Sequence, residues 1–318
     1  MKVLITGGSG SFGRAATSRL LRENLAEKVV ALARGEHRLA ALADDIGHDP
    51  RLITLVGDVR EPRRLEDALY RIDTVIHAAA LKRVAGNDPQ ELMATNFQGT
   101  VNVVRAAIAR GVERVVVLST DKAASPCTAY GISKAAAEAY AVYANLYGHP
   151  RTKISVIRYG NVAGSQGSVI PLWRAQVASG QPLTITDERC TRFWITLEGA
   201  VALVLQTLQT MQGGEIVVPA LPAASLVDLA EAIAGPDYPR KAVGLRTSEK
   251  IHELLLTDDE SPRAVWHRAG YVIEPAAPEW PYRAHRREER VLAGFRYSSQ
   301  TARRLSVEAL RGLVGEGI

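Results

Sequence analysis

A tyrosine and a lysine four residues apart follow an apolar segment that ends in its own Asp-Lys pair. They are Tyr130 and Lys134, and the pair is Asp121 and Lys122, preceded by Thr120. If a helix follows the pair, Tyr130 and Lys134 lie one turn apart on one face, where the ammonium of Lys134 would lower the pKa of the phenol. A phenol whose pKa lies nearer to neutrality is a usable general base. A second acid/base pair beside it predicts chemistry beyond simple hydride transfer.

A sheet edge must hold these residues, and the chain supplies strand-like apolar segments at regular intervals. These segments are residues 3–6, 29–33, 52–56, 74–77, 114–119 and 154–157. Helical patterns link them over residues 14–22, 64–70, 90–109 and 129–146. Alternating strands and helices predict the α/β class, with a doubly wound parallel Rossmann sheet. Thr120 follows one of these strands, at the sheet edge where such proteins place their chemistry.

The alternation changes after residue 160, where loops rich in Gly, Ser and Pro begin. Helices are expected there at residues 197–211 and 225–234, with a short strand at 215–219. We therefore predict a dinucleotide-binding Rossmann domain over residues 1–160. Residues 161–318 are expected to form a smaller substrate-binding lobe, interleaved with the first domain.

Composition excludes several classes of protein. The chain has 318 residues, 47% apolar and 23% charged, without the roughly 18-residue apolar stretch of a membrane span or a signal-peptide layout. We therefore expect a cytoplasmic protein that does not enter a membrane. Cys127 and Cys190 are the two cysteines and form no disulfide framework or zinc spacing, so no metal site is expected. The net charge of +5, concentrated in residues 283–290, comes without a nucleic-acid-binding module, so no nucleic-acid partner is expected.

A glycine-rich turn follows the first expected strand and opens the first helix. Gly7, Gly10 and Gly13 are spaced by three residues, with Ser11 and Phe12 between the last two. Gly7 permits the turn, Gly10 lets a pyrophosphate approach the backbone, and Gly13 lets the helix pack close to the sheet. All five residues are therefore expected at a dinucleotide cofactor.

The end of the second expected strand bears on which cofactor binds. An NAD-selective site usually keeps an acidic residue there for the ribose 2′-hydroxyl, but this chain has Arg34. Arg34, with Arg38 a turn further on, could clamp a 2′-phosphate, so we expect NADP rather than NAD. Glu36 keeps NAD open as the alternative.

Two further strand ends are expected to touch this cofactor. Asp58 and Val59 follow the third strand, where Asp58 could accept a hydrogen bond from the adenine amino group; an acid near a helix N-terminus is the alternative. Ala78 and Ala80 follow the fourth strand and are small where a flat cofactor must pass. Tight packing of the strand end is the alternative explanation there.

Together these motifs resemble one enzyme family. The three glycines with Tyr130 and Lys134 are similar to the extended short-chain dehydrogenase/reductase family over nearly the whole chain. More narrowly, seven segments resemble the UDP-N-acetylglucosamine 4,6-dehydratases of bacterial polysaccharide and pseudaminic acid biosynthesis. These segments are residues 78–82, 119–123, 158–162, 191–195, 213–216, 249–253 and 305–311.

This resemblance implies a reaction that stores a hydride and returns it. Tyr130 would take the proton of the sugar 4-hydroxyl as hydride leaves C4 for the nicotinamide, with Thr120 bonded near the 4-oxygen. Lys122 would then remove the C5 proton, and a protonated Asp121 would protonate the departing 6-hydroxyl. The hydride would return to C6, leaving a 4-keto-6-deoxy sugar. Lys134 would also hold the cofactor ribose.

The resemblance further implies a UDP-sugar substrate and a homo-oligomer. Asn161 would meet the diphosphate, Arg246 and Glu249 would hold the diphosphate and the uridine ribose, and Lys82 and Arg192 are further cationic candidates. Surface or fold-supporting roles are the alternative for Lys82 and Arg192. The copies would pair through the expected helices at 90–109 and 129–146.

Two segments depart from the family's usual pattern and keep other products open. Residues 246–250 read Arg-Thr-Ser-Glu-Lys where the family commonly has Arg-Pro-Gly-Glu-Lys, and residues 127–128 read Cys-Thr where it commonly has Ile-Asn. A 5,6-dehydratase that forms an exocyclic alkene and a 4-epimerase are the alternatives within the superfamily. A non-catalytic dinucleotide-binding protein is the alternative outside enzymes, and it would leave Asp121 and Lys122 as a surface salt bridge. The configuration of the product at C5 is also open.

Overall fold

Ten strands form one sheet through the body of the computed structural model, which describes residues 1–82, 88–148, 150–165, 167–276, 278–285 and 289–315. Their spatial order is β16-β14-β15-β10-β6-β5-β4-β1-β2-β3. The parallel strands are β1 (Lys2–Thr6), β2 (Lys28–Ala33), β3 (Leu52–Val56), β4 (Thr74–His77), β5 (Arg114–Thr120), β6 (Lys153–Tyr159) and β10 (Ile216–Pro219). The doubly wound parallel sheet is therefore confirmed, and its first six strands lie within two residues of their predicted bounds.

Antiparallel strands extend this sheet beyond β10. They are β14 (Ala264–His267), β15 (Gly270–Ile273) and β16 (Glu289–Arg290). The sequence prediction did not include these strands, nor α2 (Glu36–Asp45), which packs beside β2 and β3. The basic segment 283–290 reaches into β16, and its residues 286–288 lie outside the described part of the chain.

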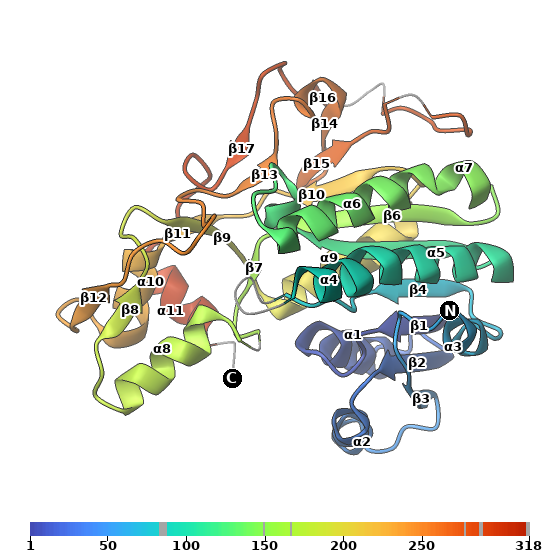
Figure 1. Cartoon of the computed structure of the whole chain (residues 1–318), viewed down its shortest axis with the longest axis horizontal. Helices are drawn as coiled ribbons and strands as arrows, with labels where there is room; N and C mark the ends of the chain where they lie inside the picture. Colours follow the sequence, from blue (N-terminus) through green and yellow to red (C-terminus); the bar gives the residue numbers. More distant parts are fainter. Residues whose placement is uncertain (83–87, 149, 166, 277, 286–288, 316–318) are drawn as a thin grey trace.

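Helices cover both faces of the sheet (Figure 1). One face packs against α1 (Ser11–Arg22) and α9 (Leu197–Thr210), and the other against α3 (Pro62–Ala68), α5 (Gly99–Arg110) and α6 (Ala129–Tyr143). Strand β1 shows why both faces are apolar. Val3 and Ile5 pack on the face covered by α1 and α9, and Leu4 packs on the face covered by α3, α5 and α6. Side chains alternate across a strand, so a strand buried on both sides must be apolar throughout.

The helix predicted at residues 90–109 is interrupted. It consists of α4 (Pro89–Leu92), a π-helical segment η1 (Met93–Gln98) and α5, which ends at Gly111 in a left-handed conformation. The next predicted helix likewise divides into α6 and the short α7 (Asn145–Gly148). A π-helical segment adds a residue to the turn and therefore changes which side chains face the sheet edge.

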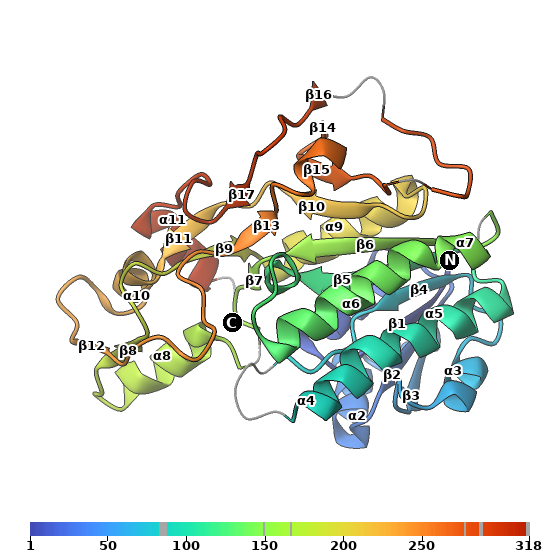
Figure 2. The same ribbon diagram turned by 45° about the horizontal axis from the view of Figure 1, so that its top comes forward.

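A smaller group of elements lies beside the main sheet and has its own core, which includes Trp173, Trp194 and Leu310. Its helices are α8 (Val169–Ala178), α10 (Leu226–Ala234) and α11 (Val307–Gly315). Its strands are β7 (Asn161–Val162), β8 (Leu183–Ile185), β9 (Thr191–Ile195), β11 (Ala223–Ser225) and β12 (Arg240–Ala242). Figures 1 and 2 show this lobe at the end of the sheet where β6 passes into β7. The carboxyl ends of the parallel strands therefore face it.

Segments of the chain after residue 160 also return to the main sheet, since α9 packs against α1 and β10 pairs with β6. The remaining short elements are the paired strands β13 (Leu254–Leu256) and β17 (Tyr297–Ser298) and the 3₁₀ turns η2 (Asp121–Ala123) and η3 (Ser261–Arg263). The division into two domains at residue 160 stays a prediction. Within the described residues, none of the helices combines the length and the apolar composition that crossing a membrane requires.

Candidate active site

The glycine-rich turn between β1 and α1 leaves room for a bound group. Gly7 has φ +70°, in the left-handed region that favours glycine, and a Cβ there would lie 2.9 Å from the backbone of Ala79. A Cβ at Gly13 would lie 2.5 Å from the Gly7 carbonyl oxygen. Helix α1 begins directly after Gly10 and has no acidic residue in its first turn, so its N-terminal N–H groups can receive an anion. These features fit the pyrophosphate of a dinucleotide.

The predicted adenosine end contains an ion-pair cluster. Arg60 donates hydrogen bonds to Asp58 from its backbone (2.9 Å), its Nε (3.0 Å) and its Nη2 (2.7 Å), whereas Arg34 Nη1 lies 4.0 Å from Asp58 Oδ2. Burial acts to raise the pKa of Asp58, but the contacts with Arg60 outweigh it and hold this pKa below its ordinary value. Arg34 and Arg38 are exposed at the surface. The sequence prediction missed Arg60, because an arginine after a strand end carries no pattern of its own.

The other residues predicted to touch the cofactor, which follow β3 and β4, differ in exposure. Val59 is 4% exposed and faces α5, since a Cβ at Gly99 would lie 2.6 Å from its Cγ2. Ala78 is half-buried beside the glycine turn, and Ala80 is exposed. The structure therefore brings Ala78 to the glycine turn, whereas Val59 is mainly a packing residue.

The helix cap at Thr128 places the predicted tyrosine and lysine. Its hydroxyl accepts a hydrogen bond from the Gly131 N–H at 3.0 Å, so that α6 begins at Ala129 with Tyr130 in its first turn and Lys134 one turn later. Both side chains are buried. The structure thus puts Tyr130 and Lys134 on one face of α6, beside the end of β5, as predicted.

The prediction that the ammonium of Lys134 lowers the pKa of Tyr130 is wrong. Burial raises the pKa of Tyr130, and this rise is only partly offset by the charge of Lys122 and a hydrogen bond with Thr120. Lys134 Nζ instead donates a hydrogen bond to the Leu118 carbonyl oxygen at 2.6 Å. Burial lowers the pKa of Lys134 to about 8, despite the opposing charge of Glu138. Lys122, not Lys134, is therefore the cation that favours the phenolate.

Asp121 and Lys122 form a close pair at the end of β5. Lys122 Nζ lies 2.8 Å from Asp121 Oδ1, which also accepts a hydrogen bond from the Thr120 hydroxyl at 2.9 Å. Asp121 is fully buried, and its Oδ2 has no hydrogen-bond partner among the described residues. The alternative of a surface salt bridge is therefore wrong.

Burial acts to lower the pKa of Lys122, but the carboxylates of Asp121 and Glu253 outweigh it and raise this pKa above its ordinary value. The lysine that was predicted to be a base therefore carries a proton in the resting structure. Any role as a base requires this proton to leave first.

Glu253 is a member of this cluster that the sequence prediction did not assign to the site. Its Oε1 lies 3.4 Å from Lys122 Nζ, and its Oε2 lies 3.8 Å from Lys250 Nζ. Lys250 also donates a hydrogen bond to the Ala124 carbonyl oxygen at 2.8 Å. The segment before β13 therefore closes over the loop between β5 and α6, from a part of the chain about 130 residues away.

A second unpredicted residue, Asn96, lies in the π-helical segment. Its side chain accepts a hydrogen bond from the Leu81 N–H (2.8 Å) and donates to the Leu81 carbonyl oxygen and the Ser133 hydroxyl (both 3.0 Å). Asn96 thereby ties the loop after β4 to α6, one residue before Lys134. No sequence pattern marks an asparagine inside a long apolar helix as such a link.

The predicted substrate residues fall into one cluster of three and two separate positions. Arg192 Nη2 lies 2.8 Å from Glu249 Oε1, and the Arg246 N–H donates a hydrogen bond to Glu249 Oε2 at 3.2 Å. Asn161 pairs with β9 opposite Trp194. Lys82 is exposed in the loop after β4, next to residues outside the described part. The structure thus brings Arg192, Glu249 and the backbone of Arg246 together, and holds Asn161 one strand away.

The two segments that depart from the family pattern touch each other. Cys127 Sγ donates a hydrogen bond to the Ser248 carbonyl oxygen at 3.0 Å. Ser248 has φ +62°, a conformation that favours glycine, at the position where the family commonly has glycine. The altered residues of both segments therefore belong to one contact over the loop between β5 and α6.

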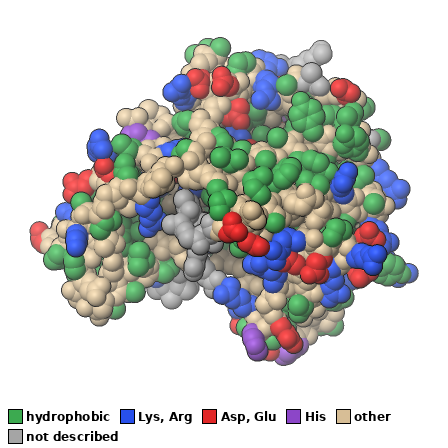
Figure 3. Space-filling model, viewed as in Figure 1, with side chains coloured by type: hydrophobic (Ala, Val, Ile, Leu, Met, Phe, Trp, Pro, Cys, Tyr) green, Lys and Arg blue, Asp and Glu red, His purple; other side chains and the backbone are tan. Residues whose placement is uncertain are grey.

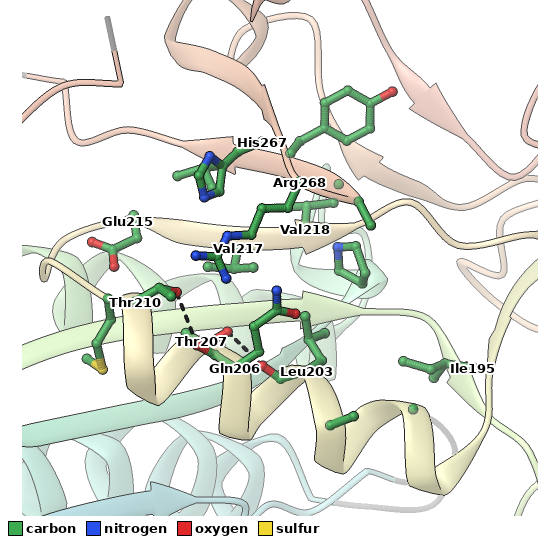
Figure 4. A pocket seen from close by; sticks show the side chains of 18 of the residues that line it. Ile195, Leu203, Gln206, Thr207, Thr210, Glu215, Val217, Val218, His267 and Arg268 are labelled. Carbon is green, nitrogen blue, oxygen red and sulfur yellow. Dashed lines mark hydrogen bonds between the residues drawn. The ribbon is translucent and has the colours of Figure 1, made fainter. Parts of the chain in front are cut away.

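A cavity of about 270 Å³ lies elsewhere, between α9 and the strands β10 and β15. Figure 4 shows Arg268, from the β14–β15 turn, reaching over β10 toward Gln206 of α9. None of the predicted site residues lines this cavity. Among the described residues, no cluster of His, Cys, Asp and Glu could hold a metal ion.

Comparison with known proteins places this geometry among sugar-nucleotide enzymes. Residues 3–275 match a family described as "Polysaccharide biosynthesis protein". UDP-N-acetylglucosamine 4,6-dehydratase (inverting) of Campylobacter jejuni is 41% identical over 278 residues, which are 86% of this chain and 83% of that protein. UDP-glucose 4-epimerase of Rickettsia typhi is 36% identical over 323 residues, which are 98% of this chain and 94% of that protein. The X-ray structure of Pen from Bacillus thuringiensis superposes with a TM-score of 0.89 at 34% identity, covering 98% of this chain and 97% of that one.

Proposed function

This chain belongs to the polysaccharide biosynthesis protein family, and from that premise we propose that it is a UDP-N-acetylglucosamine 4,6-dehydratase that inverts C5. The product is a UDP-4-keto-6-deoxyhexosamine. One observation carries the proposal: the buried Asp121, at the end of β5, accepts a hydrogen bond from Lys122, and both charges act on Tyr130 in the first turn of α6. An epimerase has no leaving group to protonate and therefore needs no such acid.

We propose NADP as the bound cofactor, which supplies the acceptor and later the donor of the hydride. Gly7, Gly10 and Gly13 would hold its pyrophosphate, and Lys134 would hold the nicotinamide ribose. Support for NADP over NAD comes from the cluster at Asp58. Arg60 already satisfies this carboxylate with three hydrogen bonds, so Arg34 at 4.0 Å can turn toward a 2′-phosphate at little cost.

Tyr130 accepts the proton of the 4-hydroxyl in the first step. Burial raises the pKa of its phenol, so the proton that the phenol holds at rest must leave to solvent before Tyr130 can act as this base. The charge of Lys122 and the hydrogen bond with Thr120 both favour the phenolate, so they reduce the free-energy cost of losing this proton. Loss of the C4 hydrogen as hydride then leaves a ketone, which acidifies the C5 hydrogen.

One proton shared by Asp121 and Lys122 prepares the elimination. Its transfer over 2.8 Å from Lys122 Nζ to Asp121 Oδ1 makes an amine and a carboxylic acid at once. The amine takes the C5 proton, and the C5–H electrons form the C5–C6 double bond. The acid gives its proton to the 6-hydroxyl as the C6–O bond breaks, and water leaves. The pair ends as ammonium and carboxylate, its resting form. Return of the stored hydride to C6 and of a proton to C5 then converts the enone into the 4-keto-6-deoxy sugar.

Two arrangements around the pair support this proton transfer. Asp121 is fully buried, and its Oδ2 has no hydrogen-bond partner among the described residues. Lys122 Nζ also lies within hydrogen-bond distance of Asp121 Oδ1, so the proton can pass directly between the two groups.

Product analysis tests the proposal. The purified protein is incubated with UDP-N-acetylglucosamine in deuterated water, and the sugar is followed by NMR and mass spectrometry. We expect loss of one water, a new C6 methyl group, deuterium at C5 and inverted C5 configuration. An exocyclic C5–C6 alkene would show a 5,6-dehydratase, and an unchanged mass with inverted C4 would show an epimerase. Either result, or no conversion, would refute the proposal.

We also propose that copies of this chain associate through α6 and α7. Figure 3 shows hydrophobic side chains gathered on the face that carries α6. The large exposed ones include Ile132 and Tyr143 of α6 and Leu146 and Tyr147 of α7, of which Tyr147 is 73% exposed. Apolar side chains grouped in this way mark association surfaces. Light scattering after size exclusion should give a mass above 34.4 kDa, and Tyr147→Glu with Tyr143→Glu should return it to that of the monomer.

A further inference from the structure

We propose that Glu253 is a positioning residue that holds Lys122 in place while Asp121 changes its charge. The inference rests on the proposed function, because it concerns the step in which Asp121 takes and gives a proton. Three observations carry it: the geometry around Lys122 Nζ, the burial of the Glu253 carboxylate, and the way the backbone fixes this residue.

Lys122 Nζ lies between two carboxylates from distant parts of the chain. Asp121 Oδ1 is 2.8 Å away and Glu253 Oε1 is 3.4 Å away. The two contacts cannot be equivalent during the reaction. Once Asp121 is protonated, its attraction for Lys122 falls, and the amine would be free to swing away from C5. Glu253 takes no part in protonating the leaving group and therefore remains a constant anchor.

The surroundings of Glu253 fit an anchor better than a stabilising ion pair. The residue is 3% exposed, and its Oε2 has no hydrogen-bond partner among the described residues. A buried carboxylate with an unsatisfied oxygen is unfavourable for folding, so stability alone does not explain it. The cations that face it are Lys122, Lys250 at 3.8 Å and Arg192, whose pKa it helps to raise. The Glu253 side chain therefore lies among three cations.

The backbone of Glu253 is fixed independently of its side chain. Its N–H donates a hydrogen bond to the Ser299 hydroxyl at 2.9 Å, and its carbonyl oxygen accepts one from the Ser299 N–H at 2.9 Å. Ser299 is fully buried. A change of the carboxylate to an amide should therefore leave the chain in place. This makes a conservative substitution informative.

The first test measures the pH dependence of the reactivity of the Lys122 amine. Wild-type protein, Glu253→Gln and the control Glu198→Gln, an exposed residue on α9, are labelled with acetic anhydride across pH, and Lys122 is quantified by mass spectrometry. Only the neutral amine reacts, and Lys122 keeps a quarter of its side chain exposed to the reagent. Loss of the Glu253 charge should lower the Lys122 pKa, with about tenfold faster labelling at a given pH for each unit. An unchanged labelling profile would overturn the proposal.

The second test separates positioning from folding. With UDP-N-acetylglucosamine, Glu253→Gln should still reduce the cofactor, but deuterium exchange at C5 should slow by roughly a hundredfold, as expected for a misplaced base. Glu253→Asp, which keeps the charge, should restore part of this rate and also serves if the amide variant does not fold. Equal losses in cofactor reduction and C5 exchange would show a merely structural role and refute the inference. If wild-type protein does not convert this substrate, the proposed function fails, while the labelling of Lys122 still decides whether Glu253 holds it.

Discussion

Replacing Asp121 by asparagine should separate the two halves of the proposed reaction. The amide nearly keeps the shape of the carboxylate, and its oxygen can still accept hydrogen bonds from Thr120 and Lys122, now 2.9 and 2.8 Å away. It cannot give a proton to the 6-hydroxyl. Tyr130 lies outside this exchange, so oxidation at C4 should continue. The hydride would then remain on the cofactor.

The size of the effect follows from the role of the residue. A positioned general acid contributes about 10²- to 10⁴-fold to a rate, which is roughly 3 to 5 kcal/mol of barrier. We expect a loss at the upper end of this range, because Asp121 is fully buried and water cannot readily replace it. The Lys122 pKa should also fall, since the charge of Asp121 raises it more than that of Glu253 does.

The assay follows two signals from the same reaction mixture. Absorbance of the reduced nicotinamide reports oxidation at C4, and mass spectrometry of the quenched sugar reports loss of water. For Asp121→Asn we expect reduced cofactor to accumulate while loss of water falls by about 10²- to 10⁴-fold. Near wild-type loss of water would refute the role of Asp121 as the acid. Loss of both signals together would show that the residue supports the site without taking part in the chemistry.

Three further perturbations test other parts of the account. Arg34→Ala should weaken NADP binding by about tenfold to a hundredfold and leave NAD nearly unchanged, as the loss of a charge-assisted phosphate contact predicts; equal effects in calorimetric titration would contradict the NADP proposal. Gly13→Ala should abolish dinucleotide binding, because its Cβ would lie 2.5 Å from the Gly7 oxygen, and unchanged binding would disprove the proposed cradle. Burial lowers the pKa of His77 to about 3, so below its ordinary value of 6.5 the unfolded chain binds the additional proton. Stability should therefore fall from pH 6.5 toward 3 by at most about 1.4 kcal/mol per unit from this residue, and denaturant unfolding of His77→Gln should show a smaller slope.

Local patterns were enough to predict the sheet and its cofactor end. Apolar segments such as Val29–Ala33 are buried on both faces, so their composition alone marks them as central strands. The glycine spacing works for the same reason, because Gly7 and Gly13 meet steric demands that no other residue satisfies. The antiparallel strands β14 and β15 were missed, since each has only four residues and therefore gives little periodicity to recognise.

The site could be predicted only where its residues are neighbours in the chain. Tyr130, Lys134 and the Asp121–Lys122 pair fall within one segment, and the structure places them together as the sequence predicted. Glu253 reaches Lys122 from about 130 residues away, and Asn96 depends on a π-helical turn, so neither has a local signal. The direction of the Tyr130 pKa was wrong for a related reason. Spacing on α6 showed that Lys134 was near, but not that burial would dominate and that its ammonium would turn to Leu118.

One isotope measurement tests the central claim most directly. UDP-N-acetylglucosamine carrying deuterium at C4 is converted in ordinary water, and the product is examined by NMR and mass spectrometry. We expect the deuterium to move from C4 to the C6 methyl group, because the proposed cycle stores one hydride and returns it within the same turnover. Product that keeps its deuterium at C4, or loses it to the solvent, would contradict the proposed cycle.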